Sequence, residues 1–273
     1  MLRDLLVHVD GGRSARGRLR FALDLAARAG ATVTGLHVTP PAEVPPLYKP
    51  SVVPKVEHEI SARLAHDARN AEAIFREEIA EPAPNAPWIE AAGDVVDGID
   101  AQACYADLVI LGQYESQGSP ERHPLPVAHS VVLRCGRPVL VVPADATAPG
   151  FENAAIAWDG SREAVRAVHD ALPLLRLMRT VEIITIAASG GGPNAGDIER
   201  LSAHLTHHGI VVSADRRVTT PNEHRSLRNE LQQGGYDLLV MGGYSHPMWL
   251  EFVVGGATQS ILLSSKTPIL VSH

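Results

Sequence analysis

The sequence has few of the features that mark secreted, membrane or nucleic-acid-binding proteins. It contains two cysteines, Cys104 and Cys135, which excludes a disulfide scaffold and a cysteine-based zinc site. No apolar run approaches the roughly 18 residues of a membrane span. With 24 Lys and Arg against 31 Asp and Glu, the net charge of −7 offers no positive field for a polyphosphate backbone. We therefore expect a cytoplasmic protein with neither a membrane nor a nucleic acid as its main partner.

Aromatic residues are also scarce, at 4% of the chain, so the core must be built from aliphatic side chains and no row of rings is available for base stacking. The hydrophobic content of 45%, with 20% charged residues, is typical of a packed globular protein. At roughly 100–200 residues per domain, the 273 residues predict two domains.

The chain repeats a set of landmarks in the same order. Short apolar runs end in Asp10-Gly11-Gly12 and, 149 residues later, in Asp159-Gly160-Ser161. At an offset of 130, later runs end at Gly112 and Gly242, and closing runs begin at Pro138 and Pro268. This order predicts a duplication, with domains at 1–145 and 152–273 joined by an Ala/Pro/Gly-rich linker at 144–150.

Within each half, short β-rich runs alternate with helical patterns. The runs at 5–9, 33–38, 88–91, 107–111 and 138–142 have counterparts at 154–158, 181–187, 210–213, 237–241 and 268–272. Helical patterns lie between them, at 14–29, 56–80, 95–104 and 127–135, then at 161–178, 197–208, 222–233 and 256–265. The alternation predicts an α/β fold of two tandem, doubly wound, five-stranded parallel-sheet domains.

Ligands of open parallel sheets bind beyond the carboxyl ends of the strands, which is where Asp10 and Asp159 stand. A carboxylate there can accept hydrogen bonds from hydroxyl or amine groups of a ligand. The simpler interpretation is that each aspartate only caps the helix that follows it.

The fourth apolar run is followed by different residues in the two halves. In the second half, Gly242 and Gly243 follow the run and two further glycines open the last helix, which allows backbone N–H groups to approach an anion. The first half has Glu115 and Pro126 in the equivalent stretch. A negative charge and a missing N–H there predict that this half does not bind a triphosphate in the same way.

The Asp-Gly-Ser turn and the Gly-x2-Gly-x9-Gly-(Ser/Thr) spacing resemble the universal stress proteins, here as a tandem with two such domains in one chain. The resemblance covers nearly all of the chain and rests on the order and spacing of the motifs. It implies a Rossmann-like fold of the adenine-nucleotide alpha-hydrolase type, in a family with members that bind ATP and members that do not.

Matched residue by residue, the resemblance favours a nucleotide site in the second half. Asp159 matches the aspartate near ribose and adenine, and Ile186 the apolar residue that ends the second strand. The phosphate-side positions are Gly242, Ser245, Gly255, Gly256 and Thr258, and Met241, which precedes them, is included in the site although a place in the core is favoured for it. Ser245 and Gly256 depart from the family's glycine and hydroxyl residue, which weakens the phosphate contacts. The first half keeps Asp10, Val38 and Gly112 as a degenerate site.

Histidines and enzyme motifs add little to this interpretation. His204 and His208 are spaced i,i+4 in a predicted helix, but no carboxylate is placed to complete a metal site, so a solvated surface is favoured. His246 lies in the predicted ligand-facing turn, where a phosphate or solvent contact is favoured over catalysis. No nucleophile elbow, GxxxxGK(S/T) or HExxH motif is present, so no catalytic residue and no metal site are predicted.

Two functions remain open from the sequence. The first is a stress-response protein that binds one adenine nucleotide, ATP with Mg²⁺, mainly in the second domain, with slow ATP hydrolysis as its only conceivable catalysis. The alternative is a binding or interaction module for a non-nucleotide small molecule or lipid-like ligand, held in the first-half cleft beneath a proline-rich flap at 40–54. We expect the closing apolar runs to pair as an intramolecular pseudo-dimer. The resemblance also implies a homodimer.

Overall fold

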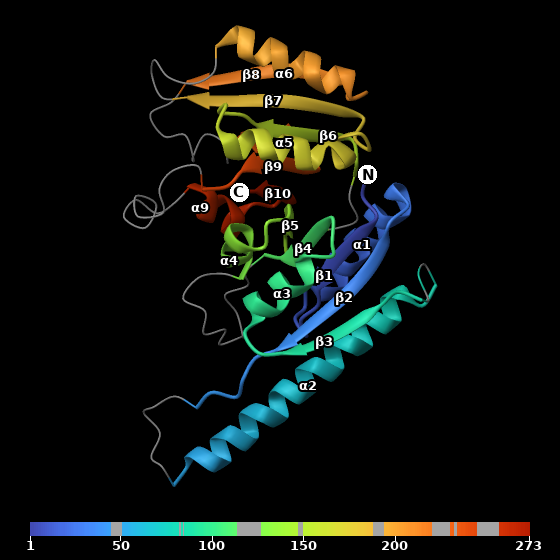
Figure 1. The fold of residues 1–273 in the computed structure, drawn as a ribbon, viewed down its shortest axis with the longest axis vertical. Helices are drawn as coiled ribbons and strands as arrows, with labels where there is room; N and C mark the ends of the chain where they lie inside the picture. The colour runs from blue at the N-terminus through green and yellow to red at the C-terminus, as the bar shows by residue number, and fades with distance from the viewer. Residues whose placement is uncertain are drawn as a thin grey trace.

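The computed structural model describes residues 1–44, 51–81, 83, 85–113, 127–146, 150–187, 194–219, 230–231, 234–244 and 257–273. Ten strands form one continuous sheet in the order β3-β2-β1-β4-β5-β10-β9-β6-β7-β8 (Figure 1). The strands are β1 Asp4–His8, β2 Thr32–Thr39, β3 Trp88–Ala92, β4 Leu108–Gly112, β5 Val139–Val142, β6 Asn153–Ala157, β7 Thr180–Ala187, β8 Val212–Thr219, β9 Leu238–Gly242 and β10 Ile269–Ser272. The two halves of the sheet have the same strand order from the edge inward. The first half runs β3-β2-β1-β4-β5, and its second-half counterparts run β8-β7-β6-β9-β10.

Helices cover both faces of this sheet. They are α1 Ala15–Ala29, α2 Val53–Ile79, α3 Val95–Ala103, α4 Val127–Arg134, α5 Arg162–Leu175, α6 Ala195–His207 and α9 Ala257–Ser264. The buried side chains of α1, α2, α5 and α6 share one apolar cluster, and those of α3, α4 and α9 share another on the opposite face. The predicted α/β, doubly wound, parallel-strand architecture is therefore confirmed.

The two halves join where β5 pairs with β10, the one antiparallel pair among the described strands. Leu140 lies opposite Leu270 in this pair, and both side chains are fully buried. All residues of both strands are buried, because the strands lie at the centre of the sheet with helices on both faces. The predicted pairing of the closing runs is confirmed.

Side-chain caps fix where several helices begin beside the strand ends. Ser161 Oγ accepts the Ala164 N–H at 3.1 Å and starts α5. Asn194 and Asp197 form a reciprocal capping box at the start of α6, with bonds of 3.0 and 3.1 Å. These caps fix the first turns of α5 and α6.

Two segments differ from the sequence prediction. Helix α2 already begins at Val53, inside the proline-rich segment expected as a flap, because Pro54 is tolerated in a first helical turn. Strand β8 begins two residues later than the predicted 210–213 and runs to Thr219, because its charged residues suit a sheet edge but hide the apolar signal. The predicted helix at 222–233 and the flap residues 45–50 lie largely outside the described residues. Within the described ranges, no helix has the length and apolar character to cross a membrane.

Candidate functional site

Asp10 and Asp159 occupy equivalent turns just beyond β1 and β6. Asp10 Oδ1 accepts the Gly12 N–H at 3.0 Å, and Asp159 Oδ1 accepts the Ser161 N–H at 2.9 Å. Neither aspartate is the helix N-cap, because α1 and α5 begin after Ser14 and Ser161. Each aspartate therefore stabilises its own turn and keeps a second carboxylate oxygen for another partner.

In the first half, that second oxygen is already used. Arg18 of α1 is 2% exposed, and its Nη2 lies 3.0 Å from Asp10 Oδ2. Burial is the largest single influence and raises the pKa of Asp10, but the charges of Arg18 and His8 and the hydrogen bonds from Arg18 and Gly12 together lower this pKa to about 2. The same guanidinium fills the space beside Gly112, where a Cβ atom would collide with Nη1. Arg18 thus covers two of the three residues predicted for the first-half site, and the third, Val38, is buried against Gly98 of α3.

In the second half, Asp159 instead lies on the wall of an open cleft of about 710 Å³. The cleft runs between α5 and α6, next to the carboxyl end of β6. Its walls are formed by Trp158, Asp159, Gly160, Val165, Val168, His169, Asp197, Arg200, Leu201 and His204. Its volume is within the usual range for small-molecule sites.

The described part of the predicted phosphate loop is tightly packed. A Cβ atom at Gly242 would lie 2.5 Å from Ala164 N of α5, and one at Gly243 would lie 2.6 Å from Val271 Cγ1. The Gly243 N–H donates to Ser272 O at 2.9 Å. The Tyr244 N–H donates to Thr258 Oγ1 at 3.3 Å. Gly242 and Gly243 therefore have a packing role. The N–H groups of Gly243 and Tyr244 already have hydrogen-bond partners.

The other predicted residues of the second-half site have different surroundings. Met241 and Thr258 are buried, at 7% and 4% exposure. Ile186 pairs through its backbone with Val218 of β8. Ser245, Gly255 and Gly256, like His246, lie outside the described residues. The assignment of these residues to a nucleotide stays a prediction.

Gly242→Ala is expected to lower the free energy of unfolding by about 1–2 kcal/mol, because its Cβ would press on the backbone of α5 at Ala164 and at Glu163 C, 2.6 Å away. Urea unfolding measures the change. Gly17→Ala in α1, where the nearest atom is 3.3 Å away, is the control and should be neutral or slightly stabilising. Equal stabilities of the two variants would show that α5 moves aside without cost.

Tyr244, which follows β9, contacts the first half of the chain. Tyr244 has a positive φ of 59° and hydrogen-bonds through its hydroxyl to His129 Nδ1 of α4. Their rings meet edge to face, with centroids 4.6 Å apart. Gln113, which follows β4, donates to the Leu262 and Ser265 carbonyls at 2.9 and 3.0 Å. Tyr244 and the end of α9 are thus both tied to side chains of the first half.

The predicted histidine pair is part of a larger cluster. His204 is partly buried rather than solvated, and its ring lies 5.3 Å from that of His169 on α5 and 4.6 Å from that of His208. Sequence reasoning missed His169, because nothing local indicates that α5 and α6 face each other here. Among the residues that the structure describes, no three His, Cys, Asp or Glu side chains are arranged so that they could hold a metal ion.

Comparison with known proteins gives the family. The model of the universal stress protein family matches residues 1–143. The chain belongs to this family. No functionally curated protein matches the sequence.

Solved structures show that the fold of this universal stress protein extends over both halves. A universal stress protein from Archaeoglobus fulgidus aligns over 98% of this chain and 95% of its own, at 18% identity and a TM-score of 0.70. A protein of unknown function from Pseudomonas aeruginosa aligns over 99% of this chain and 92% of its own, at 15% identity and a TM-score of 0.59. At these identities the likeness is one of fold.

Proposed function

We propose that this protein binds one adenine nucleotide, ATP with Mg²⁺, and that the site lies in the second half around Asp159. One observation carries the proposal: Asp159 lies on an open cleft of about 710 Å³, whereas its counterpart Asp10 is paired with the buried Arg18. The second Asp159 oxygen, which has no partner among the described residues, can accept hydrogen bonds from ribose hydroxyls or the adenine amino group. Family membership supports a nucleotide as the ligand.

We also propose a stress-response role in the cytoplasm, with domains at 1–145 and 152–273 forming the pseudo-dimer and the whole chain forming a homodimer. Family membership supports the role, and the free Cys104 and Cys135 suit a reducing compartment. The central β5–β10 pairing supports the internal pseudo-symmetry. The net charge of −7 argues against a nucleic-acid partner.

Asp159→Ala is expected to weaken ATP binding by at least about tenfold, because ligand hydroxyl or amine groups lose a charged acceptor. Isothermal titration calorimetry, with and without Mg²⁺, measures the affinity. Asp24→Ala removes an exposed carboxylate of α1 and is the control that should bind as the wild type does. A variant with wild-type affinity would remove Asp159 from the site.

A non-nucleotide ligand is the second candidate. The observation that favours it is that the described N–H groups of the glycine loop, Gly243 and Tyr244, already donate to Ser272 and Thr258. The first-half cleft is the less favourable place for such a ligand, since Arg18 covers Gly112 there. Absence of binding heat with ATP and the wild-type protein would favour this candidate over the nucleotide.

A further inference from the structure

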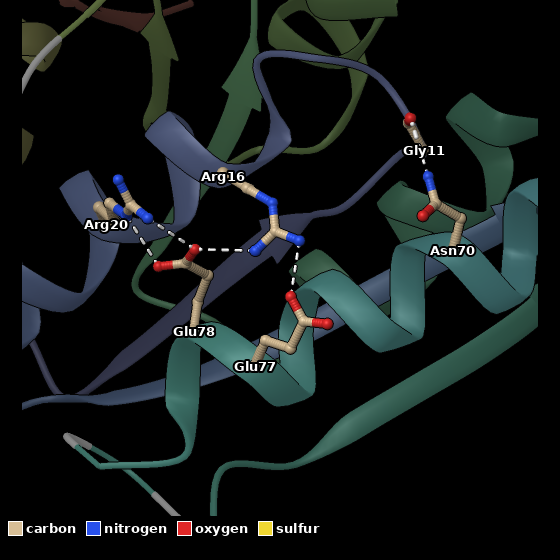
Figure 2. Close-up of polar contacts among 6 residues, drawn as sticks. All are labelled: Gly11, Arg16, Arg20, Asn70, Glu77 and Glu78. Atoms are coloured by element: carbon tan, nitrogen blue, oxygen red, sulfur yellow. Dashed lines mark hydrogen bonds and ion pairs between the residues drawn. The ribbon is translucent and has the colours of Figure 1, made fainter.

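Helix α2 is fixed to the first half of the protein along its carboxyl-terminal part. Arg16 of α1 lies 2.6 Å from Glu77 and 3.1 Å from Glu78, and Arg20 forms two bonds of 2.8 and 3.0 Å with Glu78 (Figure 2). The buried residues of α2 all lie in this part of the helix and are Ala71, Ile74, Phe75 and Ile79. Ion pairs and apolar packing therefore hold this part of α2 against α1 and the sheet.

The amino-terminal part of α2 extends past the ends of β2 and β3 (Figure 1). The Asn70 side chain still reaches the turn after β1, where Nδ2 donates to Gly11 O at 3.2 Å (Figure 2). Residues 53–69 precede this contact, and they span about 25 Å at 1.5 Å per residue. Every one of them is at least partly exposed. We call residues 53–69 the projecting part of α2.

An apolar row runs along the projecting part of α2. Val53, Val56, Ile60 and Leu64 follow one another at intervals of three or four residues, so they share one face of the helix. This face continues the buried face of α2, because Ala71 follows Leu64 after two helical turns. The four residues belong to neither of the two apolar clusters that the described residues form. An apolar row of this kind is typical of a surface that binds another protein.

The charged residues beside this row are complementary to themselves. Lys55, Glu59, Arg63 and Asp67 alternate in sign at a spacing of four residues. Read from the opposite end, the series has the opposite sign at every position. Two copies of α2 that run antiparallel about a point near Ile60 therefore bring each Glu59 level with the partner's Arg63. Parallel copies would instead bring like charges level with each other.

We propose that a second copy of this chain docks on the projecting part of α2, with the two helices antiparallel and Ile60 next to the two-fold axis. The inference rests on the proposed homodimer and names the surface that forms it. A two-fold contact needs a surface that is complementary to itself, and the apolar row with its charge series has this property. The apolar strands β5 and β10 are not available for a second copy, because they pair within the chain.

Analytical ultracentrifugation of the full chain tests the docking surface. The wild type is expected to dimerise, and Ile60→Glu should raise the dissociation constant of the dimer at least about a hundredfold, because it buries a carboxylate beside its own symmetry mate. Ala62→Glu is the matched control, since it adds the same charge at an exposed position about 200° around the helix. This variant should dimerise as the wild type does. Thermal unfolding followed by circular dichroism compares the stabilities of the two variants.

The outcomes separate the inference from the proposals on which it rests. An unchanged dissociation constant in Ile60→Glu would overturn the inference and leave the proposed homodimer standing. An unchanged dimer with a lower melting temperature would show that the apolar row packs within its own chain, which also overturns the inference. A monomeric wild type would contradict the homodimer and the inference together. In each case the ATP affinity of Ile60→Glu should equal that of the wild type, because the proposed nucleotide site lies in the other half.

Disulfide cross-linking tests the antiparallel orientation. In a Cys104→Ser/Cys135→Ser background, Ile60→Cys should link two copies under mild oxidation, because the two helices meet at this residue. Val53→Cys should not, since antiparallel helices that meet at Ile60 place the two Val53 positions roughly 20 Å apart along the helix. Efficient linking through both residues would indicate parallel helices and overturn the proposed arrangement. Linking through neither residue would overturn docking on α2.

Discussion

The free energy of unfolding is expected to fall by about 3 kcal/mol between pH 7 and pH 4 because of His8 alone. Burial lowers the pKa of this histidine from 6.5 to about 4; Asp10 opposes the shift, while Arg18 and His37 add to it. In the unfolded chain His8 binds its proton near pH 6.5, whereas in the folded protein it stays neutral down to about pH 4. The unfolded state therefore gains protons first, and stability decreases as the pH falls through this window.

Urea unfolding of the wild type and of His8→Leu at several pH values measures this contribution. Other groups also titrate in this range, so the difference between the two proteins is the informative quantity. The wild type should lose about 3 kcal/mol more than the variant between pH 7 and pH 4. Parallel pH profiles would show that His8 becomes protonated without cost inside the fold.

Asp10→Ala is expected to lower the free energy of unfolding by about 2–3 kcal/mol, because it leaves the Arg18 guanidinium buried without its carboxylate. The cost should be below the roughly 3–5 kcal/mol typical of broken buried pairs, since the Asp10 side chain is itself 38% exposed. Arg18 Nε and Nη2 lack well-directed hydrogen bonds, so no other described group replaces the lost charge. Chemical denaturation at neutral pH measures the change.

The double variant Asp10→Ala/Arg18→Met tests the cause of that loss. A methionine side chain in place of Arg18 would fill similar volume without a charge, so the double variant should recover at least half of the stability lost in Asp10→Ala. No recovery would mean that the Asp10 turn, with its bond to Gly12, matters more than the charge pair. This experiment concerns the first half alone, and the cleft beside Asp159 should be unaffected.

The sequence predicted most of the fold because the relevant signals are local or repeated. Asp-Gly-Gly at 10–12 and Asp-Gly-Ser at 159–161 mark the same turn twice, and the structure places both beyond equivalent strands. The aliphatic runs that became β5 and β10 were too apolar to remain at an edge, which correctly predicted their pairing. Strand β8 was underestimated because Asp215, Arg216 and Arg217 interrupt the apolar pattern.

The surroundings of the candidate site were less predictable, because they depend on contacts between distant elements. Arg18 lies on the buried face of α1, beside Leu19 and Ala22. Its spacing from these apolar residues is the one signal in the sequence that the Arg18 side chain is buried. Val165 and His169 stand in α5 where α1 has Arg16 and Arg20, and they line the cleft. The sequence could not show the effect of this replacement, because the glutamates of α2 that pair with the two arginines are known only from the structure. The structure also shows that Gly242 and Gly243 are needed for close packing.

The central β5–β10 pair has a consequence for synthesis of the chain. Strand β5 is complete when residue 142 has emerged, but its partner is the last strand of the chain and nearly half of the protein lies between them. At a synthesis rate of roughly 5–20 residues per second, the aliphatic edge of β5 stays unpaired for on the order of ten seconds before β10 is made. During that interval nascent chains on neighbouring ribosomes present the same open edge to one another, which makes this strand the natural point for chaperone protection.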